Sequence, residues 1–156
     1  MSGLSWLVVL RKREGFRAAF HDFEPSIVAH FGAGDVSRLM NDAGIVRNRA
    51  KIEATINNAR RYGDLVSEFG SFAAYVWRFA PMPRARLAAY EDLVKVKAGD
   101  EAVALSKDLR RRGWAFVGPT TVHSFMEAMG LLNDHVRGCV AGAECLRARR
   151  DFTPPR

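Results

Sequence analysis

The sequence contains only two cysteines among its 156 residues, Cys139 and Cys145. So few thiols do not support a disulfide framework, and they indicate a reducing compartment. No stretch approaches the roughly 20 apolar residues that a membrane span requires. The apolar opening, residues 4–10, has no basic region before it and no small-residue cleavage site after it, so it does not read as a signal peptide. We therefore expect a cytoplasmic protein with no membrane partner.

Lysine is scarce relative to arginine, and the formal net charge is +7 with a sequence pI near 10.0. Because arginine forks match phosphate oxygens bidentately, this balance favours a polyanionic partner. An Arg- and Ala-rich composition carried by the whole genome would give the same charge, so both explanations stay open. The hydrophobic content of 48% is typical of a globular protein. The length suits a single helical domain over residues 1–146, followed by a basic, disordered tail over residues 147–156.

Strand patterns are also lacking, and neither a strand pair nor an internal repeat is found. Apolar spacing predicts helices from about residue 4 to 20, over 26–30 and 36–41, from the low fifties to 62 or beyond, over 72–79, from 100 to about 112, and from 120 onwards. Residues 84–99 lack periodicity and are predicted to form a loop. The fold class is therefore all-α.

Several side chains are expected to define these helices. Asp35 is predicted to cap the helix over 36–41, Ser71 the helix over 72–79, and Thr120 or Thr121 the last one. One buried stripe is predicted to consist of Leu4, Leu7, Val8, Phe16, Ala19, Phe20 and Phe23, a second of Ile52, Ile56 and Ala59, a third of Ala102, Leu105 and Leu109, and a fourth of Val122, Phe125, Met126 and Met129.

Residues 39–52 predict the end of one helix, a tight turn and the start of a longer helix. Gly44 stands where the turn needs a positive φ or a close backbone approach. The cations Arg47, Arg49 and Lys51 follow at the head of the second helix, where backbone N–H groups and the helix dipole attract anions. This is the layout of a helix-hairpin-helix that grips a nucleic-acid phosphate. An ordinary corner between two helices with a solvated basic face fits the residues about equally well.

Three further groups could carry chemistry. His135 and Cys139 are spaced i, i+4, so on a helix they would point the same way, like half of a zinc site. Taken alone, the two residues fit a buried Cys beside a core or capping His better, because structural zinc needs four ligands and the only other sulfur nearby is Cys145. Ser124, His123 and Asp134 could be assembled into a catalytic triad, although their spacing does not require it and no G-x-S-x-G motif exists. Trp6 could stack on a base, or it could be an ordinary core residue.

Three stretches resemble the DNA-3-methyladenine glycosylase I family. The first is Gly3-Leu4-Ser5-Trp6, followed by residues 10–14 and 20–23. The second is the hairpin, residues 42–52. The third is residues 113–121, followed by 124–126 and 130–139. The resemblance covers nearly the whole chain in the right order, and the last block is highly specific.

The resemblance implies a helix-hairpin-helix DNA glycosylase-like helical bundle that binds duplex DNA and flips an alkylated base into a pocket. It implies that Trp6 stacks on the base, that Ser124 lies on the pocket-facing helix, and that Gly3 and Leu4 enter the DNA stack. The residues expected to bind DNA are thus Gly3, Leu4, Gly44, Arg47, Arg49 and Lys51. His135 and Cys139 match two of the four ligands of a structural zinc; the chemistry itself needs no cofactor. We expect a monomer.

Family members carry a further segment before the Gly-Leu-Ser-Trp block, which supplies two more zinc ligands, several pocket aromatics and the glutamate that binds the methylated base. This chain begins at Met1, just before that block, so we expect an N-terminally truncated member whose catalytic residue is unknown. Glu14 is the nearest carboxylate on the first helix and is not expected to substitute.

The first hypothesis is a base-excision-repair glycosylase that hydrolyses the N-glycosidic bond of 3-methyladenine in alkylated DNA, with activity impaired by the missing pocket residues. The alternative is a catalytically silent helix-hairpin-helix remnant that binds DNA and excises nothing. A plain helical interaction domain is the third, and it predicts no DNA binding at all.

Overall fold

The computed structural model describes residues 5–82, 87–93 and 98–155. Within these ranges the chain is helical without a strand, and the only β pairing is an isolated parallel bridge between Ala88 and Val136. This confirms the all-α prediction. None of the described helices is both long and apolar enough to cross a bilayer. The chain forms two compact units, Met1–Gly70 with Arg110–Phe116, and Ser71–Leu109 with Val117–Arg156.

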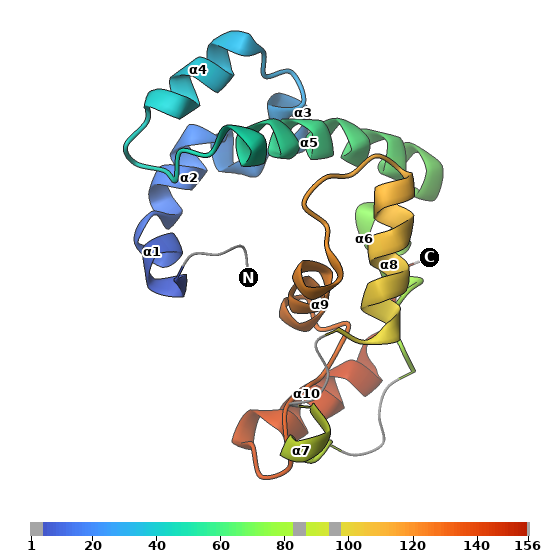
Figure 1. Ribbon diagram of the computed structural model, residues 1–156. Coiled ribbons are helices and arrows are strands. Elements are labelled where there is room, and N and C mark those ends of the chain that lie inside the picture. Colours follow the sequence, from blue (N-terminus) through green and yellow to red (C-terminus); the bar gives the residue numbers. More distant parts are fainter. Residues whose placement is uncertain (1–4, 83–86, 94–97, 156) are drawn as a thin grey trace. The chain divides into compact units, whose positions relative to one another are not determined.

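The first unit contains α1 (Trp6–Arg11), α2 (Arg13–Ala19), the short 3₁₀ turn η1 (His21–Phe23), α3 (Pro25–Val28), α4 (Ala33–Asn41) and α5 (Arg49–Phe69). The long helix α5 packs against α3 and α4 (Figure 1). The apolar spacing of α5 explains this packing, because Ile52 and Ile56 are buried, with Ala59 partly buried beside them, as predicted. They join a core that also contains Ala19, Phe20, Val28, Phe31, Val36, Leu39 and Ile45.

The N-terminal part of this unit differs from the prediction. The expected helix over 4–20 is broken at Lys12, which separates α1 from α2. Ala19 and Phe20 are buried as predicted, but Leu7, Val8 and Phe23 are exposed. The predicted stripe therefore begins to pack only in α2, because the break at Lys12 changes the direction of the chain.

The prediction that Asp35 caps the following helix was also wrong. Helix α4 begins earlier, and its N-cap is Gly32. Asp35 is the third helical residue, and its Oδ2 accepts a hydrogen bond from the Gly32 N–H at 3.1 Å. A carboxylate at this position stabilises the helix start by reaching back to the cap, so the residue is used from inside the helix.

The second unit contains α6 (Phe72–Trp77), α7 (Tyr90–Leu93), most of α8 (Asp100–Arg111), α9 (Pro119–Ala128) and α10 (Val140–Asp151). Its core is made of Ala74, Tyr75, Val76, Ala102, Leu105, Leu109, Val122, Met126, Leu131 and Leu132. Ser71 caps α6 as predicted, since its Oγ accepts from the Ala74 N–H at 2.9 Å.

Four expectations fail in this unit. Gly118, followed by Pro119 at the first helical position, caps α9 in place of Thr120 or Thr121. Met129 lies beyond the end of α9 and is 56% exposed, so it leaves the predicted core face. The predicted loop 84–99 contains α7, and α10 makes residues 147–151 helical where a disordered tail was expected.

Candidate nucleic-acid interface

The hairpin of residues 42–48 joins α4 to α5 as the sequence predicts. Asp42 Oδ1 accepts the Gly44 N–H at 2.7 Å and closes the turn, and Ile45 anchors it in the core at 2% exposure. The sequence left open whether Gly44 is needed for a positive φ or for a close backbone approach. Gly44 is not among the glycines with positive φ, so the close approach is the reason. A Cβ atom on Gly15 would lie 2.5 Å from the Gly44 carbonyl oxygen, and one on Gly44 would lie 2.9 Å from Asp42 Oδ1.

The head of α5 carries the three predicted cations. Arg47 and Arg49 are exposed, and Arg49 forms an ion pair with Glu53 at 3.4 Å. Lys51 is half-buried, and its backbone N–H is bound at 3.0 Å by Oδ1 of Asn48, the N-cap of α5. An exposed helix N-terminus with cations beside it can bind a phosphate group.

Sequence reasoning missed the residue that holds this hairpin in place. Lys12, in the break between α1 and α2, donates from Nζ to the Ala43 carbonyl oxygen at 2.6 Å. Together with the close contact of Gly15 and Gly44, this bond ties the turn to the N-terminal helices. No pattern in the sequence pointed to this bond, because the charged run Arg11–Glu14 is compatible with a continuous helix.

An apolar cavity lies beside the same N-terminal helices. It has a volume of about 550 Å³ and is lined by Trp6, Val9, Leu10, Arg13, Phe16, Arg17 and Phe23. Trp6 is 63% exposed, so its ring is accessible at the wall of this cavity. Phe23 stacks on the buried Phe20 with ring centroids 5.2 Å apart. The aromatic walls of this cavity suit a planar ring such as a nucleobase.

The turn that places Phe23 is conformationally costly. His21, Asp22 and Phe23 all have positive φ values, of 50°, 54° and 59°. Consecutive non-glycine residues in the left-handed region cost on the order of 1 kcal/mol each and persist only where surrounding packing imposes them. Such local strain clusters at functional sites, which supports the cavity as a site.

The other predicted site residues lie elsewhere. Gly3 and Leu4 fall outside the described residues. Ser124 lies on α9 in the second unit, with an exposed side chain. Of the triad assembled from sequence, the structure brings together His123 and Asp134, whose Nε2 and Oδ2 atoms are 3.2 Å apart. Ser124 follows His123 directly on the helix and therefore points in another direction.

His135 and Cys139 come together, although not on a helix as predicted. They lie in the turn before α10, whose N-cap is Cys139, and Cys139 Sγ is 3.3 Å from His135 Nδ1. The pair can supply two zinc ligands. Within residues 5–82, 87–93 and 98–155, no third His, Cys, Asp or Glu joins these two in a metal-binding cluster, so the four donors of a structural zinc are not assembled there.

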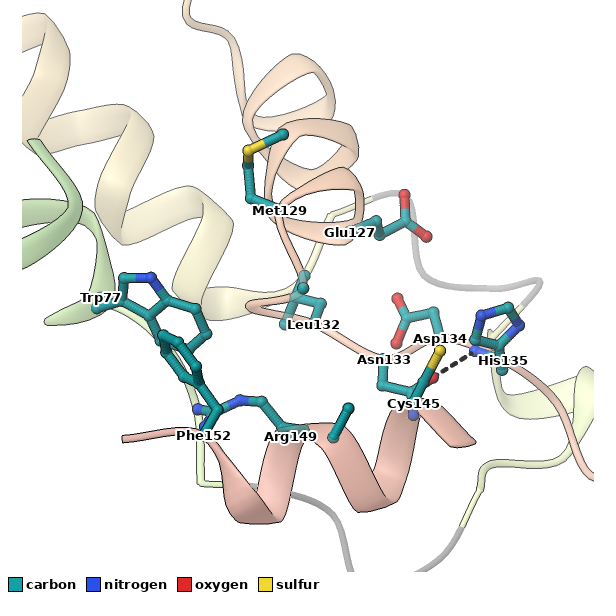
Figure 2. Close-up of a pocket in the computed structure, with 12 residues that line it drawn as sticks. Trp77, Glu127, Met129, Leu132, Asn133, Asp134, His135, Cys145, Arg149 and Phe152 are labelled. Atoms are coloured by element: carbon teal, nitrogen blue, oxygen red, sulfur yellow. Dashed lines mark hydrogen bonds between the residues drawn. The ribbon is translucent and has the colours of Figure 1, made fainter. Parts of the chain in front are cut away.

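A second cavity, of about 640 Å³, lies in the second unit and was not predicted (Figure 2). Its aromatic end is formed by Trp77 and Phe152, with ring centroids 4.7 Å apart, and by the Arg149 guanidinium, 4.6 Å from the Trp77 ring. Its polar end includes Glu127 and Asp134. No pattern in the sequence predicted this cavity, because residues 147–156, which supply part of its wall, were expected to form a disordered tail.

Comparison with known proteins shows which family the chain is similar to. The model of the methyladenine glycosylase family matches residues 1–142. DNA-3-methyladenine glycosylase 1 of Escherichia coli is 47% identical over 141 residues, which cover 88% of this chain and 74% of that protein. The DNA-3-methyladenine glycosylase of Haemophilus influenzae is 40% identical over 139 residues, covering 88% of this chain and 75% of its own.

Solved structures agree with the sequence comparison. A crystal structure of 3-methyladenine DNA glycosylase I superposes with a TM-score of 0.81 at 44% identity, covering 89% of this chain and 76% of that one. A variant of 3-methyladenine DNA glycosylase I, solved in complex with 3-methyladenine, gives a TM-score of 0.82 at 40% identity, covering 90% and 76%. The predicted glycosylase fold is therefore confirmed.

Proposed function

The chain belongs to the methyladenine glycosylase family, and from this membership we propose that it hydrolyses the N-glycosidic bond of 3-methyladenine in alkylated DNA. The observation that carries the proposal is the 47% identity to a DNA-3-methyladenine glycosylase over 88% of this chain. The activity belongs to base-excision repair, and its partner is duplex DNA that contains alkylated bases.

The chemistry asks little of the protein beyond binding and orientation. Methylation at N3 makes the adenine cationic and therefore a good leaving group, so the glycosidic bond needs only modest assistance. The enzyme must extrude the base, hold it against an aromatic surface and let water complete the hydrolysis. Electrostatic attraction between a ring face and a cation favours the methylated base over a neutral one.

We assign base stacking to Trp6, because its exposed ring forms part of a 550 Å³ cavity with Phe16 and Phe23. The hairpin is proposed as a helix-hairpin-helix phosphate clamp, with Gly44 at its turn and Arg47, Arg49 and Lys51 beside it. Ser124 is proposed as a base-pocket residue, and Gly3 and Leu4 as residues that enter the DNA stack; these three assignments rest on the resemblance alone.

The direct test is release of 3-methyladenine from methylated duplex DNA, quantified by chromatography. We expect Trp6→Ala to reduce kcat/KM by about tenfold to a hundredfold, since stacking on one base is worth roughly 1–3 kcal/mol. The matched control is Tyr90→Ala on α7, because Tyr90 is 64% exposed and Trp6 is 63% exposed. Equal losses in both variants would contradict the role of Trp6.

The clamp is tested separately by the salt dependence of duplex binding. Arg47→Ala should lower the slope of log affinity against log salt by about 1, because one phosphate contact is lost. Arg110→Ala, an exposed arginine at the end of α8, is the control and should leave the slope unchanged. Salt-dependent binding without base release would identify the catalytically silent DNA-binding form, and no binding at all would leave only a helical interaction domain.

A further inference from the structure

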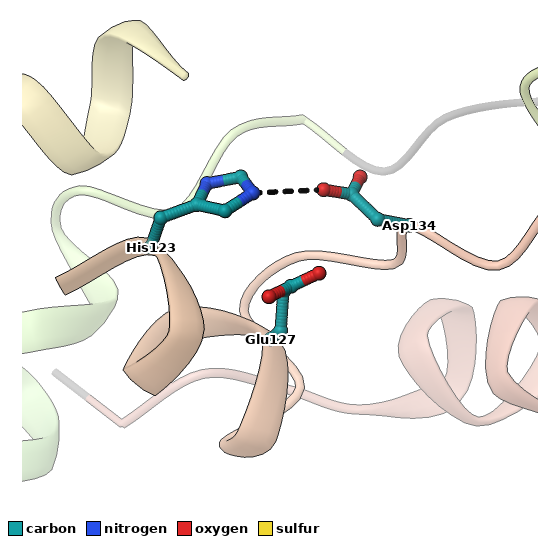
Figure 3. A group of neighbouring side chains, drawn as sticks. All are labelled: His123, Glu127 and Asp134. Carbon is teal, nitrogen blue, oxygen red and sulfur yellow. Dashed lines mark ion pairs between the residues drawn. The ribbon is translucent and has the colours of Figure 1, made fainter. Parts of the chain in front are cut away.

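Three ionisable side chains, His123, Glu127 and Asp134, converge in the second unit. His123 and Glu127 are four residues apart on α9 and therefore lie on the same face of that helix. Asp134 comes from the segment between α9 and α10 and points at them (Figure 3). One ligand atom of each residue lies within 4.8 Å of the corresponding atoms of the other two.

The position of Asp134 is set by backbone bonds that do not involve the cluster. The N–H groups of Leu131 and Leu132 both donate to the Met126 carbonyl oxygen, at 2.9 and 3.2 Å. Both leucines are also buried in the core. The segment that carries Asp134 is thus folded back onto α9, and the three side chains meet at a site that the fold already provides.

The environment of the cluster is suited to a bound cation. The side chains of His123 and Asp134 are 13% and 14% exposed, so one carboxylate and the imidazole are held close together with limited access to water. Glu127 is exposed, and both carboxylates line the 640 Å³ cavity described above. That cavity can supply water molecules as additional ligands.

We propose that His123, Glu127 and Asp134 form a binding site for one divalent transition-metal ion. One imidazole nitrogen with two carboxylate oxygens suits Mn²⁺, Fe²⁺ or Zn²⁺, and water completes the coordination. The ion would fasten the segment before α10 to helix α9. The site is distinct from the His135–Cys139 pair, which does not share a ligand with it.

A hydrogen bond between the Gly99 N–H and His123 competes with metal binding, because it determines which ring nitrogen carries the proton. His123 Nδ1 lies 3.4 Å from the backbone N–H of Gly99, so in the metal-free chain Nε2 carries the ring proton and donates it to Asp134. A metal at Nε2 displaces that proton to Nδ1, and the Gly99 N–H loses its acceptor. At 3.4 Å this hydrogen bond is near the outer limit of the geometry, so little binding energy is lost with it.

The experiment measures Mn²⁺ binding to the chelator-treated 156-residue chain by electron paramagnetic resonance. Mn²⁺ is chosen because it prefers oxygen and imidazole ligands to thiolate, which separates this site from Cys139. We expect one Mn²⁺ per chain, and an affinity at least about tenfold weaker in Glu127→Gln and in Asp134→Asn. The matched control, Glu144→Gln, replaces an exposed carboxylate on α10 and should bind as the wild type does.

Cobalt substitution adds an independent measurement, because a cobalt–thiolate bond gives a charge-transfer absorption that an oxygen and nitrogen site lacks. The proposal expects bound Co²⁺ without that band, retained in Cys139→Ser and weakened in Glu127→Gln. Failure of the wild type to bind Mn²⁺ or Co²⁺, equal affinity in Glu127→Gln and the wild type, or loss of the ion in Cys139→Ser would overturn it. None of these outcomes depends on glycosylase activity.

Discussion

At the scale of single residues, close backbone packing at Gly15 is the tightest constraint on the hairpin. We expect Gly15→Ala to destabilise the protein by about 1–3 kcal/mol, because its Cβ would lie 2.5 Å from the Gly44 carbonyl oxygen and backbone must move to admit it. Chemical denaturation measures the change in the free energy of unfolding.

The control substitution is expected to change the free energy of unfolding in the opposite direction. Gly63→Ala lies within α5, where a Cβ would meet nothing within 4 Å, so it should stabilise by roughly 0.5–1 kcal/mol through improved helix propensity. If Gly15→Ala proves as harmless as Gly63→Ala, the hairpin is not held by close approach.

Two carboxylates make the first unit sensitive to acid. The Ser26 hydroxyl and then its backbone N–H lower the pKa of Glu24, and the Gly32 N–H is the largest cause that lowers the pKa of Asp35. These bonds favour the charged forms, so their stabilisation is present above the ordinary carboxyl pKa of about 4 and is lost as pH falls through the lower folded values.

We therefore expect the melting temperature of the wild type to fall below about pH 4, and to fall less steeply when Glu24→Gln and Asp35→Asn are combined. Ser26→Ala should resemble Glu24→Gln, because it removes the donor that contributes most. Thermal melts across the acid range provide the measurement. An unchanged slope in the double variant would show that other groups govern acid unfolding.

At the scale of elements, one amide attaches a distant segment to α5. Asn58 donates from Nδ2 to the Ala115 carbonyl oxygen and accepts the Ala115 N–H at Oδ1, both at 2.9 Å. The side chain thus replaces the backbone partner that Ala115 would have in a helix or sheet. Residues 110–116 belong to the first unit, and these two bonds join them to α5.

Asn58→Ala should lower the free energy of unfolding by about 2 kcal/mol, since two hydrogen bonds are lost and Ala115 keeps unsatisfied polar groups. Asn41→Ala is the matched control, because that exposed amide bonds only within its own helix, to the Ser37 carbonyl oxygen at 3.0 Å. Its effect should stay within about 0.5 kcal/mol. Similar losses in the two variants would argue against the link.

At the scale of the whole molecule, the face of α1 is the main apolar surface that the first unit leaves exposed among its described residues. Trp6, Leu7 and Leu10 are 63%, 56% and 54% exposed. Neighbouring apolar side chains of this size mark an interaction surface or cause self-association. This exposure agrees with the proposed base-binding role. It also predicts that the protein self-associates through the α1 face.

Leu7→Gln should therefore raise the concentration at which the protein begins to self-associate, as followed by static light scattering. Val140→Gln on α10 serves as the control, because Val140 is 96% exposed but stands outside this face. We expect it to leave the threshold unchanged. If both substitutions raise the threshold equally, exposed apolar side chains anywhere on the protein, and not the α1 face in particular, control association.

The sequence alone determined the helical class, the hairpin with its turn at Gly44, and the core face of α5. These features depend on local spacing: residues at i, i+4 and i+7 share a helix face whatever surrounds them, and caps act within three residues. Ser71 at the start of α6 was predictable for the same reason.

Tertiary structure decided what local spacing does not contain. The sequence predicted one helix over residues 4–20, whereas the helix is broken at Lys12, whose Nζ donates to the Ala43 carbonyl oxygen 31 residues away. His135 and Cys139 meet across a turn and not along the helix that their spacing suggested. Asp134 reaches His123 because buried leucines fold its segment back onto α9. Each of these depends on the path that the folded chain takes in space, which spacing along the sequence does not determine.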